Sequence, residues 1–144
     1  MPTITRIALA VLLFASPAAA QGPEAHGVMA AINQYFKGHA TGSDEEMRKA
    51  FLPTAHIEGN RQGKFTTWTV DEYVKNFSGK PAADEASRKR TIDSIDVSGT
   101  AAMAKATLVH GQTTFVDYFV LLKVDGEWKI ANKVYTASPT VKQP

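Results

Sequence analysis

Residues 113–136, Thr-Thr-Phe-Val-Asp-Tyr-Phe-Val-Leu-Leu-Lys-Val-Asp-Gly-Glu-Trp-Lys-Ile-Ala-Asn-Lys-Val-Tyr-Thr, contain the pattern that decides the fold. Two runs rich in β-branched and aromatic residues flank Asp125-Gly126, a dipeptide typical of a two-residue hairpin turn. Such a turn predicts an antiparallel pair of strands whose register can be written down. The pairs predicted on one face are Lys123 with Trp128, Leu121 with Ile130, Phe119 with Asn132, and Asp117 with Val134. The other face would carry Val116, Tyr118, Val120, Ala131, Lys133 and Tyr135.

The same turn chemistry divides residues 89–137 into four antiparallel strands. Ser98-Gly99 and His110-Gly111 are the other turn signals. A two-residue loop at Gly111-Gln112 would bring Ala104 and Ala106 beside Phe119 and Asp117. Small residues beside a carboxylate on an otherwise apolar face leave room for a ligand, so this face predicts a pocket.

Three helices and a short hairpin are predicted before these strands. The helices cover residues 25–39, a segment that Ser43 caps and Pro53 ends, and a segment that Thr69 caps with Glu72 in a capping box. Two short strands, 55–59 and 64–67, are joined by a turn at 60–63. The order predicts an α+β fold with three helices on one face of a curved, antiparallel six-stranded sheet.

The N-terminal residues have the order of a secretion signal. Arg6 precedes an apolar run at 7–15, and Ala18-Ala19-Ala20 offers small residues before a cut. Nine apolar residues are too few to cross a hydrocarbon core, which needs about 20. We therefore expect residues 1–20 to be removed, leaving one periplasmic or secreted domain, residues 21–144, with no membrane contact after cleavage.

Composition excludes some classes of partner. The chain has 16 basic and 14 acidic residues and no cysteine. Without Arg6 the balance is 15 to 14, a net charge of +1, which gives no electrostatic case for binding nucleic acid or an anionic membrane. Without cysteine, an exported fold depends on its core rather than on disulfides.

Several segments, in this order and spacing, resemble the nuclear transport factor 2-like (NTF2-like) superfamily, and more narrowly its group called putative lumazine-binding, close to the SnoaL-like proteins. The segments are Tyr35-Phe36, Phe51-Leu52-Pro53-Thr54-Ala55, Ile95-Asp96-Val97-Ser98-Gly99, Phe115-Val116-Asp117-Tyr118, and 121–134. The resemblance implies a cone in which the sheet wraps the long first helix around a deep apolar pocket. Members of the superfamily differ widely in activity, so the fold alone does not assign one.

The ketosteroid isomerases of this superfamily offer a comparison for the site. They hold a substrate oxygen with a tyrosine near the end of the first helix and a protonated aspartate on a late strand. The resemblance places Tyr35 and Asp117 in these roles. Gly59 stands at the position of the base, and alternation points Glu58 to the opposite face, so no catalytic residue is assigned.

Eight residues form the predicted ligand pocket. They are Tyr35, Phe65, Phe115, Asp117, Phe119, Ile130, Asn132 and Val134. Two readings of Asp117 stay open. It is a neutral hydrogen-bond donor in an apolar site, or it has a structural place only, as an ionised carboxylate satisfied by a backbone amide or as a side chain that an error in the register turns outward. For Tyr35 a core residue with a satisfied hydroxyl is the stronger alternative to a ligand contact, because most tyrosines on helix faces are of that kind.

No metal or cofactor is predicted. The four histidines, 26, 39, 56 and 110, lack metal-ligand spacing, and alternation turns His56 outward. None of the four is placed in the pocket.

Three functions remain open. The leading hypothesis is an exported domain that binds a small apolar or aromatic molecule bearing a carbonyl or hydroxyl group. The second is an isomerase or dehydratase of the ketosteroid isomerase type, which would require a glutamate or histidine projecting into the pocket. The third is an interaction module that pairs with itself or with another protein through the outer sheet face, which would carry Val116, Tyr118, Val120 and Tyr135. We expect a homodimer, because Val116, Tyr118, Val120 and Ala131 would otherwise leave a large apolar patch in water.

Overall fold

The computed structural model describes residues 22–141; the predicted signal peptide lies outside them. The helices are α1 (Pro23–Thr41), α2 (Asp44–Ala50) and α3 (Val70–Val74), with one 3-10 turn at Glu85–Ser87. The strands are β1 (His56–Arg61), β2 (Lys64–Thr69), β3 (Lys89–Ser98), β4 (Ala101–His110), β5 (Thr113–Val124) and β6 (Glu127–Pro139). The predicted α+β class, with three helices and six strands, is confirmed.

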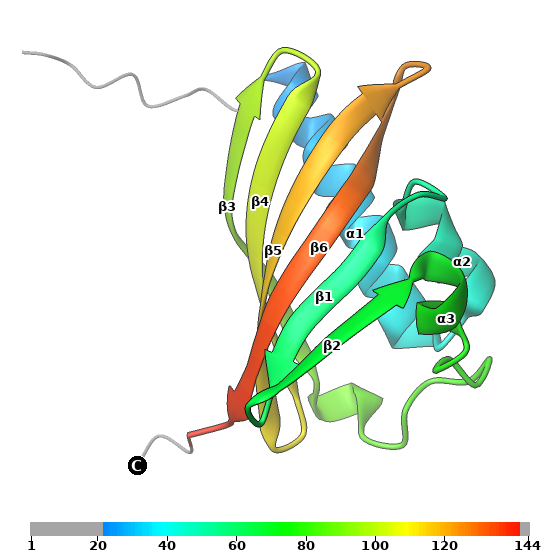
Figure 1. The fold of residues 1–144 in the computed structure, drawn as a ribbon, viewed down its shortest axis with the longest axis vertical. Helices are drawn as coiled ribbons and strands as arrows, with labels where there is room; N and C mark the ends of the chain where they lie inside the picture. The colour runs from blue at the N-terminus through cyan, green and yellow to red at the C-terminus, as the bar shows by residue number, and fades with distance from the viewer. Residues whose placement is uncertain (1–21, 142–144) are drawn as a thin grey trace, which may run out of the picture.

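The six strands form one curved sheet in the order β2-β1-β6-β5-β4-β3 (Figure 1). All neighbouring strands are antiparallel except β1 and β6, which run parallel. The prediction of an entirely antiparallel sheet was wrong at this pair. No hairpin joins β1 to β6, so no turn signal in the sequence fixes their relative direction.

The helix starts follow from local capping. The Thr69 hydroxyl accepts from the Glu72 amide and the Glu72 carboxylate accepts from the Thr69 amide, so the predicted capping box is present. At α2 only half of the predicted box forms. Ser43 accepts from the Glu46 amide, but the Glu46 carboxylate turns to Lys37, Lys49 and Gln34.

A β-bulge in β6 corrects the predicted register. The predicted pairs hold from the Asp125-Gly126 turn to Leu121 with Ile130, and then Ala131 is skipped so that Val120 pairs with Asn132. One extra residue reverses the face of every side chain that follows it. Asn132 and Val134 therefore leave the predicted pocket face, and Lys133 and Tyr135 replace them.

The two faces of the sheet differ in what covers them. The inner face packs against α1, with Ala104, Ala106, Leu108, Asp117, Phe119, Leu121, Ile130, Lys133 and Tyr135 all buried. The outer face exposes Met103, Tyr118, Val120, Leu122 and Val134. The register predicted between β4 and β5 is confirmed, because Ala104 pairs with Phe119 and Ala106 with Asp117. These alanines leave room for the residues that α1 inserts.

Candidate functional site

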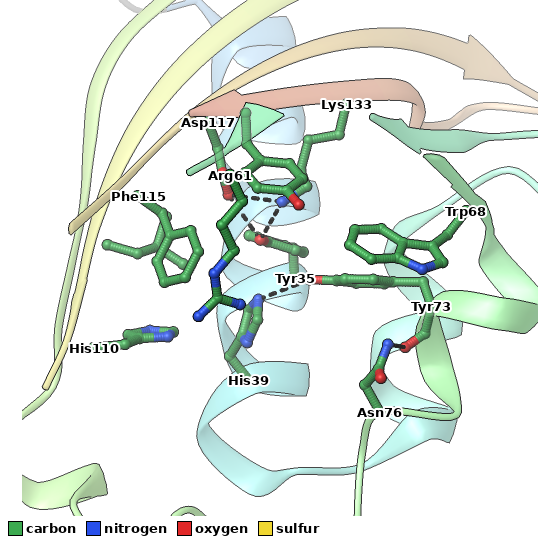
Figure 2. A pocket seen from close by; sticks show the side chains of 12 residues that line it. Tyr35, His39, Arg61, Trp68, Tyr73, Asn76, His110, Phe115, Asp117 and Lys133 are labelled. Carbon is green, nitrogen blue, oxygen red and sulfur yellow. Dashed lines mark hydrogen bonds and ion pairs between the residues drawn. The ribbon is translucent and has the colours of Figure 1, made fainter. Parts of the chain in front are cut away.

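A cavity of about 300 Å³ lies between the inner face of the sheet, α1 and α3. Seven rings make up most of its wall: Tyr35, His39, Trp68, Tyr73, His110, Phe115 and Tyr135. Three charged residues, Arg61, Asp117 and Lys133, and the amide of Asn76 also line it (Figure 2). The cavity is therefore aromatic rather than aliphatic and contains a buried charge pair.

The charge pair belongs to a three-residue cluster contributed by α1, β5 and β6. The Tyr35 hydroxyl donates to Asp117 Oδ2 at 2.7 Å. Lys133 Nζ donates to the Tyr35 oxygen at 3.0 Å and to Asp117 Oδ2 at 3.2 Å. All three side chains are buried, and Asp117 Oδ1 has no hydrogen-bond partner among residues 22–141. Within the described residues, the cluster thus leaves Asp117 Oδ1 and one N–H of the Lys133 ammonium without a partner.

The protonation states follow from these contacts. Burial disfavours the charge on Lys133, but Tyr73 and Asp117 outweigh it and raise the pKa of the lysine above its usual range. Burial first, and Asp117 second, raise the pKa of Tyr35 well above 10, so its hydroxyl keeps its proton. An aspartate that accepts from both groups is in the arrangement of an ionised carboxylate. The partners of Asp117 are thus the Tyr35 hydroxyl and the Lys133 ammonium, and not the backbone amide that one of the two readings expected.

Aromatic rings surround the Lys133 ammonium. Its nitrogen lies 5.1 Å from the ring centre of Tyr35, 5.6 Å from that of Tyr73 and 4.9 Å from that of Tyr135. Cation–π attraction at these distances offsets part of the cost of burying the charge. The cage thus holds the ammonium beside the cavity.

Gly59 makes room for one wall of this cage. A Cβ atom at Gly59 would lie 2.4 Å from the Tyr135 ring, so only glycine allows the ring to rest on β1. Tyr135 also stacks on Trp68 with an interplanar angle of 8°, and its hydroxyl lies 2.8 Å from Thr66 Oγ1. Gly59, at the position where ketosteroid isomerases have their base, therefore shapes the pocket wall.

Two histidines missed by the sequence reasoning line the cavity. His39 Nε2 lies 3.2 Å from the Tyr73 hydroxyl, and the rings of His39 and His110 are 5.2 Å apart. Burial first, then Lys133, holds the pKa of His39 well below 6.5. Burial, then Arg90, lowers the pKa of His110 from 6.5 to about 4. Both imidazoles are therefore neutral at pH 7.

The sequence does indicate the positions of His39 and His110, but through helix and strand periodicity and not through metal-ligand spacing. His39 follows Tyr35 by four residues and so shares its helix face. His110 continues the inward alternation of Ala104, Ala106 and Leu108 on β4. His26 and His56 are exposed, the latter as alternation predicted.

The predicted pocket residues divide into two groups. Tyr35, Phe115 and Asp117 lie on the cavity wall. The other five do not: Phe65 is 66% exposed on the edge strand β2, Phe119 and Ile130 are buried in the core, Val134 is on the outer face, and Asn132 accepts from the His56 amide. Phe65 points outward because Thr66 and Trp68 take the inward positions of β2.

Further features bear on possible partners. Within residues 22–141, no helix is long and apolar enough to span a bilayer. In the same part of the chain, no three histidine, cysteine, aspartate or glutamate side chains are grouped as metal ligands would be.

The model of one protein family, described as "Putative lumazine-binding", matches residues 23–136. The chain belongs to this family. An NTF2-like protein of unknown function from Shewanella baltica OS155 is 29% identical and superimposes with a TM-score of 0.72, covering 81% of this chain and 95% of that one. Another from Methylobacillus flagellatus KT is 32% identical, with a TM-score of 0.70 and coverage of 80% and 92%. The resemblance to NTF2-like proteins is thereby confirmed, and family membership indicates a small-molecule-binding domain.

A curated relative carries the name of an enzyme. "Aldolase FrzH" of Cladobotryum sp is 24% identical over 118 residues, which is 81% of this chain and 93% of that protein. The similarity therefore extends over almost the whole of both domains.

Proposed function

We propose that the domain binds a small, flat molecule bearing a hydroxyl or carbonyl group in the cavity beside Tyr35, Asp117 and Lys133. The observation that carries this proposal is the buried Asp117 Oδ1, which has no hydrogen-bond partner among the described residues although it belongs to a charged cluster. A buried acceptor without a donor costs about 1–3 kcal/mol. A ligand hydroxyl that enters the cavity supplies that donor.

Lys133 offers the complementary contact. An ammonium has three N–H donors, and the Tyr35 and Asp117 oxygens use two of them. The third is free to hold a ligand oxygen. Rings on both sides of the cavity favour a flat, partly apolar body, and its volume is at the lower end of the range for small-molecule sites.

Calorimetry with 4-hydroxybenzamide, a flat neutral probe with one hydroxyl, tests the proposal. We expect the wild-type protein to bind it and Asp117→Asn to weaken binding about tenfold, since hydrogen bonds to charged groups contribute about 1.5–3 kcal/mol. Asp96→Asn, which alters an exposed carboxylate on β3, is the matched control and should bind as the wild type does. Equal binding by both variants, each folded by circular dichroism, would contradict the proposal.

An aldolase-type or isomerase-type enzyme is the second candidate. The sequence reasoning required a histidine or glutamate directed into the pocket, and His110 meets this requirement with a buried Nε2 that has no partner among the described residues. A neutral imidazole can take a proton from a substrate, and Lys133 with Tyr35 can hold the oxygen of the resulting enolate. The name of the Cladobotryum relative supports the same chemistry.

Lys133 itself is unsuited to forming an imine. Its raised pKa keeps the amine protonated, whereas attack on a carbonyl requires the neutral form. The enzyme candidate therefore predicts proton transfer without a covalent intermediate.

Deuterium exchange at the methyl group of 4-hydroxyacetophenone, followed by NMR, tests this candidate. The wild-type protein should accelerate exchange over buffer, His110→Gln should abolish the acceleration, and the exposed control His26→Gln should retain it. Borohydride treatment with the same ketone should leave the protein mass unchanged. Exchange that survives in His110→Gln would rule out His110 as the base.

Export and dimerisation complete the proposed function. We propose that residues 1–20 direct secretion, so N-terminal sequencing of exported material should begin at Gln21. We also propose that the outer face forms a homodimer interface. Its exposed side chains, Met103, Tyr118, Val120, Leu122 and Val134, lie on three adjacent strands and support this assignment.

A further inference from the structure

Arg61, the last residue of β1, carries a positive charge that has no role in the hydroxyl contact proposed above. Its guanidinium carbon lies 5.9 Å from the ring centre of Phe115 at the cavity wall. Figure 2 shows the guanidinium directed into the cavity, on the side of His39 and His110. It forms no ion pair or side-chain hydrogen bond with any residue from 22 to 141. Arg61 is therefore a free, planar donor at the exposed mouth of an aromatic cavity.

The charge balance of the cavity makes this arginine significant. Lys133 and Asp117 neutralise each other, and the two imidazoles on the wall are uncharged. Nearby Arg88 and Arg90 are already paired with Asp84 and Glu85. Arg61 thus leaves the cavity lining with one uncompensated positive charge.

The two ends of the cavity therefore favour different chemical groups of a ligand. The inner end presents an acceptor, Asp117 Oδ1, and a spare ammonium N–H, which suit a neutral hydroxyl. The mouth presents a guanidinium, whose planar fork matches the two oxygens of a carboxylate. A carboxylate at the inner end would instead face the Asp117 charge at close range. The geometry therefore also fixes the orientation of a ligand that has both groups.

We propose that the ligand is a small, flat hydroxy acid, bound with its hydroxyl at Asp117 and Lys133 and its carboxylate at Arg61. This inference rests on the proposed binding function and adds the charge and orientation of the ligand. Between these ends, the rings of Phe115 and Tyr135 form walls against which a flat body packs.

Calorimetry with a matched pair of probes, 4-hydroxybenzoate and 4-hydroxybenzamide, tests the inference at pH 7. The probes have the same ring and hydroxyl and differ only in the charge at the other end. Wild-type protein should bind the acid at least about tenfold more tightly than the amide, as one charge-assisted bidentate contact would give. Raising the salt concentration from about 50 to 500 mM should reduce this preference, because the contact lies at the solvent-exposed mouth.

Arg61→Met should abolish the preference, so that the acid binds no more tightly than the amide, and should weaken the acid more than the amide. Lys64→Met is the matched control, because Lys64 pairs with Arg61 across the β1–β2 hairpin, is exposed and lies outside the cavity wall. It removes the same charge from the protein and should keep the wild-type preference. A lost preference in both variants would indicate a general field effect and overturn the role of Arg61.

The remaining outcomes separate this inference from the proposed function. If wild-type protein binds acid and amide equally, the hydroxyl site stands and the carboxylate site fails. An equal loss of both probes in Arg61→Met would mean that the arginine only shapes the wall, which also overturns the inference. If neither probe binds at millimolar concentration, the binding function fails together with it.

Discussion

The inner and outer faces of one sheet show opposite relations between polarity and burial. On the inner face, an ion pair between Asp117 and Lys133 is almost completely buried. On the outer face, Val120 is 53% exposed and Met103 is 52% exposed. Charges are ordinarily solvated and apolar side chains ordinarily buried. The inner face therefore holds a buried ion pair within an apolar core, whereas the outer face leaves apolar side chains exposed.

The bulge at Ala131 creates much of this contrast. Without it, alternation would place Lys133 and Tyr135 outside and Val134 inside, and the cavity would lose its ammonium and one wall. A single inserted residue therefore determines both what the pocket can bind and which apolar side chains the outer face shows.

The largest expected effect comes from a charge placed on the outer face. Wild-type protein should be a dimer by light scattering at tens of micromolar, which requires a dimerisation free energy of at least about 7 kcal/mol. Val120→Glu should halve the mass, because the carboxylate would be buried without a partner in the interface. Val141→Glu, the same substitution at a residue 85% exposed outside the sheet, should remain dimeric. A monomeric wild-type protein would contradict the proposed interface.

The next effect comes from removing one charge from the inner face. Asp117→Leu should lower the free energy of unfolding by about 3–5 kcal/mol, because Lys133 is left buried and unpaired. The double variant Asp117→Leu/Lys133→Met should recover most of this loss, since it removes both charges. Urea denaturation measures both. If the double variant is no more stable than the single one, the ion pair is not the cause.

Local sequence patterns predicted the elements of the inner face but not its final composition. Thr69 and Glu72 fixed the start of α3, and Gly111-Gln112 fixed the pairing of Ala106 with Asp117, because each depends on residues close in the chain. Tyr35 and Asp117 were singled out, and the structure brings their side chains together at 2.7 Å. These contacts follow from helix periodicity and hairpin register.

The rest depended on tertiary structure. The bulge at Ala131 has no glycine or proline to mark it, so regular alternation assigned Asn132 and Val134 to the pocket in place of Lys133 and Tyr135. The parallel pairing of β1 with β6 brings Gly59 against Tyr135, across a long separation in the chain. His39 and His110 meet only when α1 packs on the sheet. The periodicity of a single sequence does not predict contacts between residues that are far apart in the chain.

A smaller effect should follow from filling the space beside Tyr135. Gly59→Ala would place a Cβ atom 2.4 Å from the Tyr135 ring and displace it from Trp68. We expect a loss of about 1–3 kcal/mol, typical of overpacking, and weaker binding of 4-hydroxybenzamide. Gly59 is not among the glycines with a positive φ, so the loss would come from crowding of the ring. Gly63→Ala, at a positive φ but with open space where its Cβ would lie, should leave binding unchanged. Unchanged binding in Gly59→Ala would mean that the ring position is unimportant for the cavity.

The smallest expected effect is a pH dependence of the free energy of unfolding that comes from the histidines of the inner face. In the folded protein the pKa of His110 is about 4, against 6.5 when unfolded, so the unfolded chain takes up a proton first as the pH falls. Stability should therefore decrease from pH 7 towards pH 4, and the half-buried His39, whose pKa is also lowered, acts in the same direction. Carboxylates such as Glu46, with a pKa of about 2, respond only below about pH 4.5. Melting curves between pH 7 and 5 thus report the histidines of the inner face.

Allowing for the partial exposure of His110, its removal in His110→Gln should flatten this dependence by about 1 kcal/mol, or roughly 3–5 °C in Tm. His56→Gln, at an exposed position, should keep the wild-type slope. A melting temperature that is constant from pH 7 to 5 in the wild-type protein would contradict the lowered pKa of both cavity histidines.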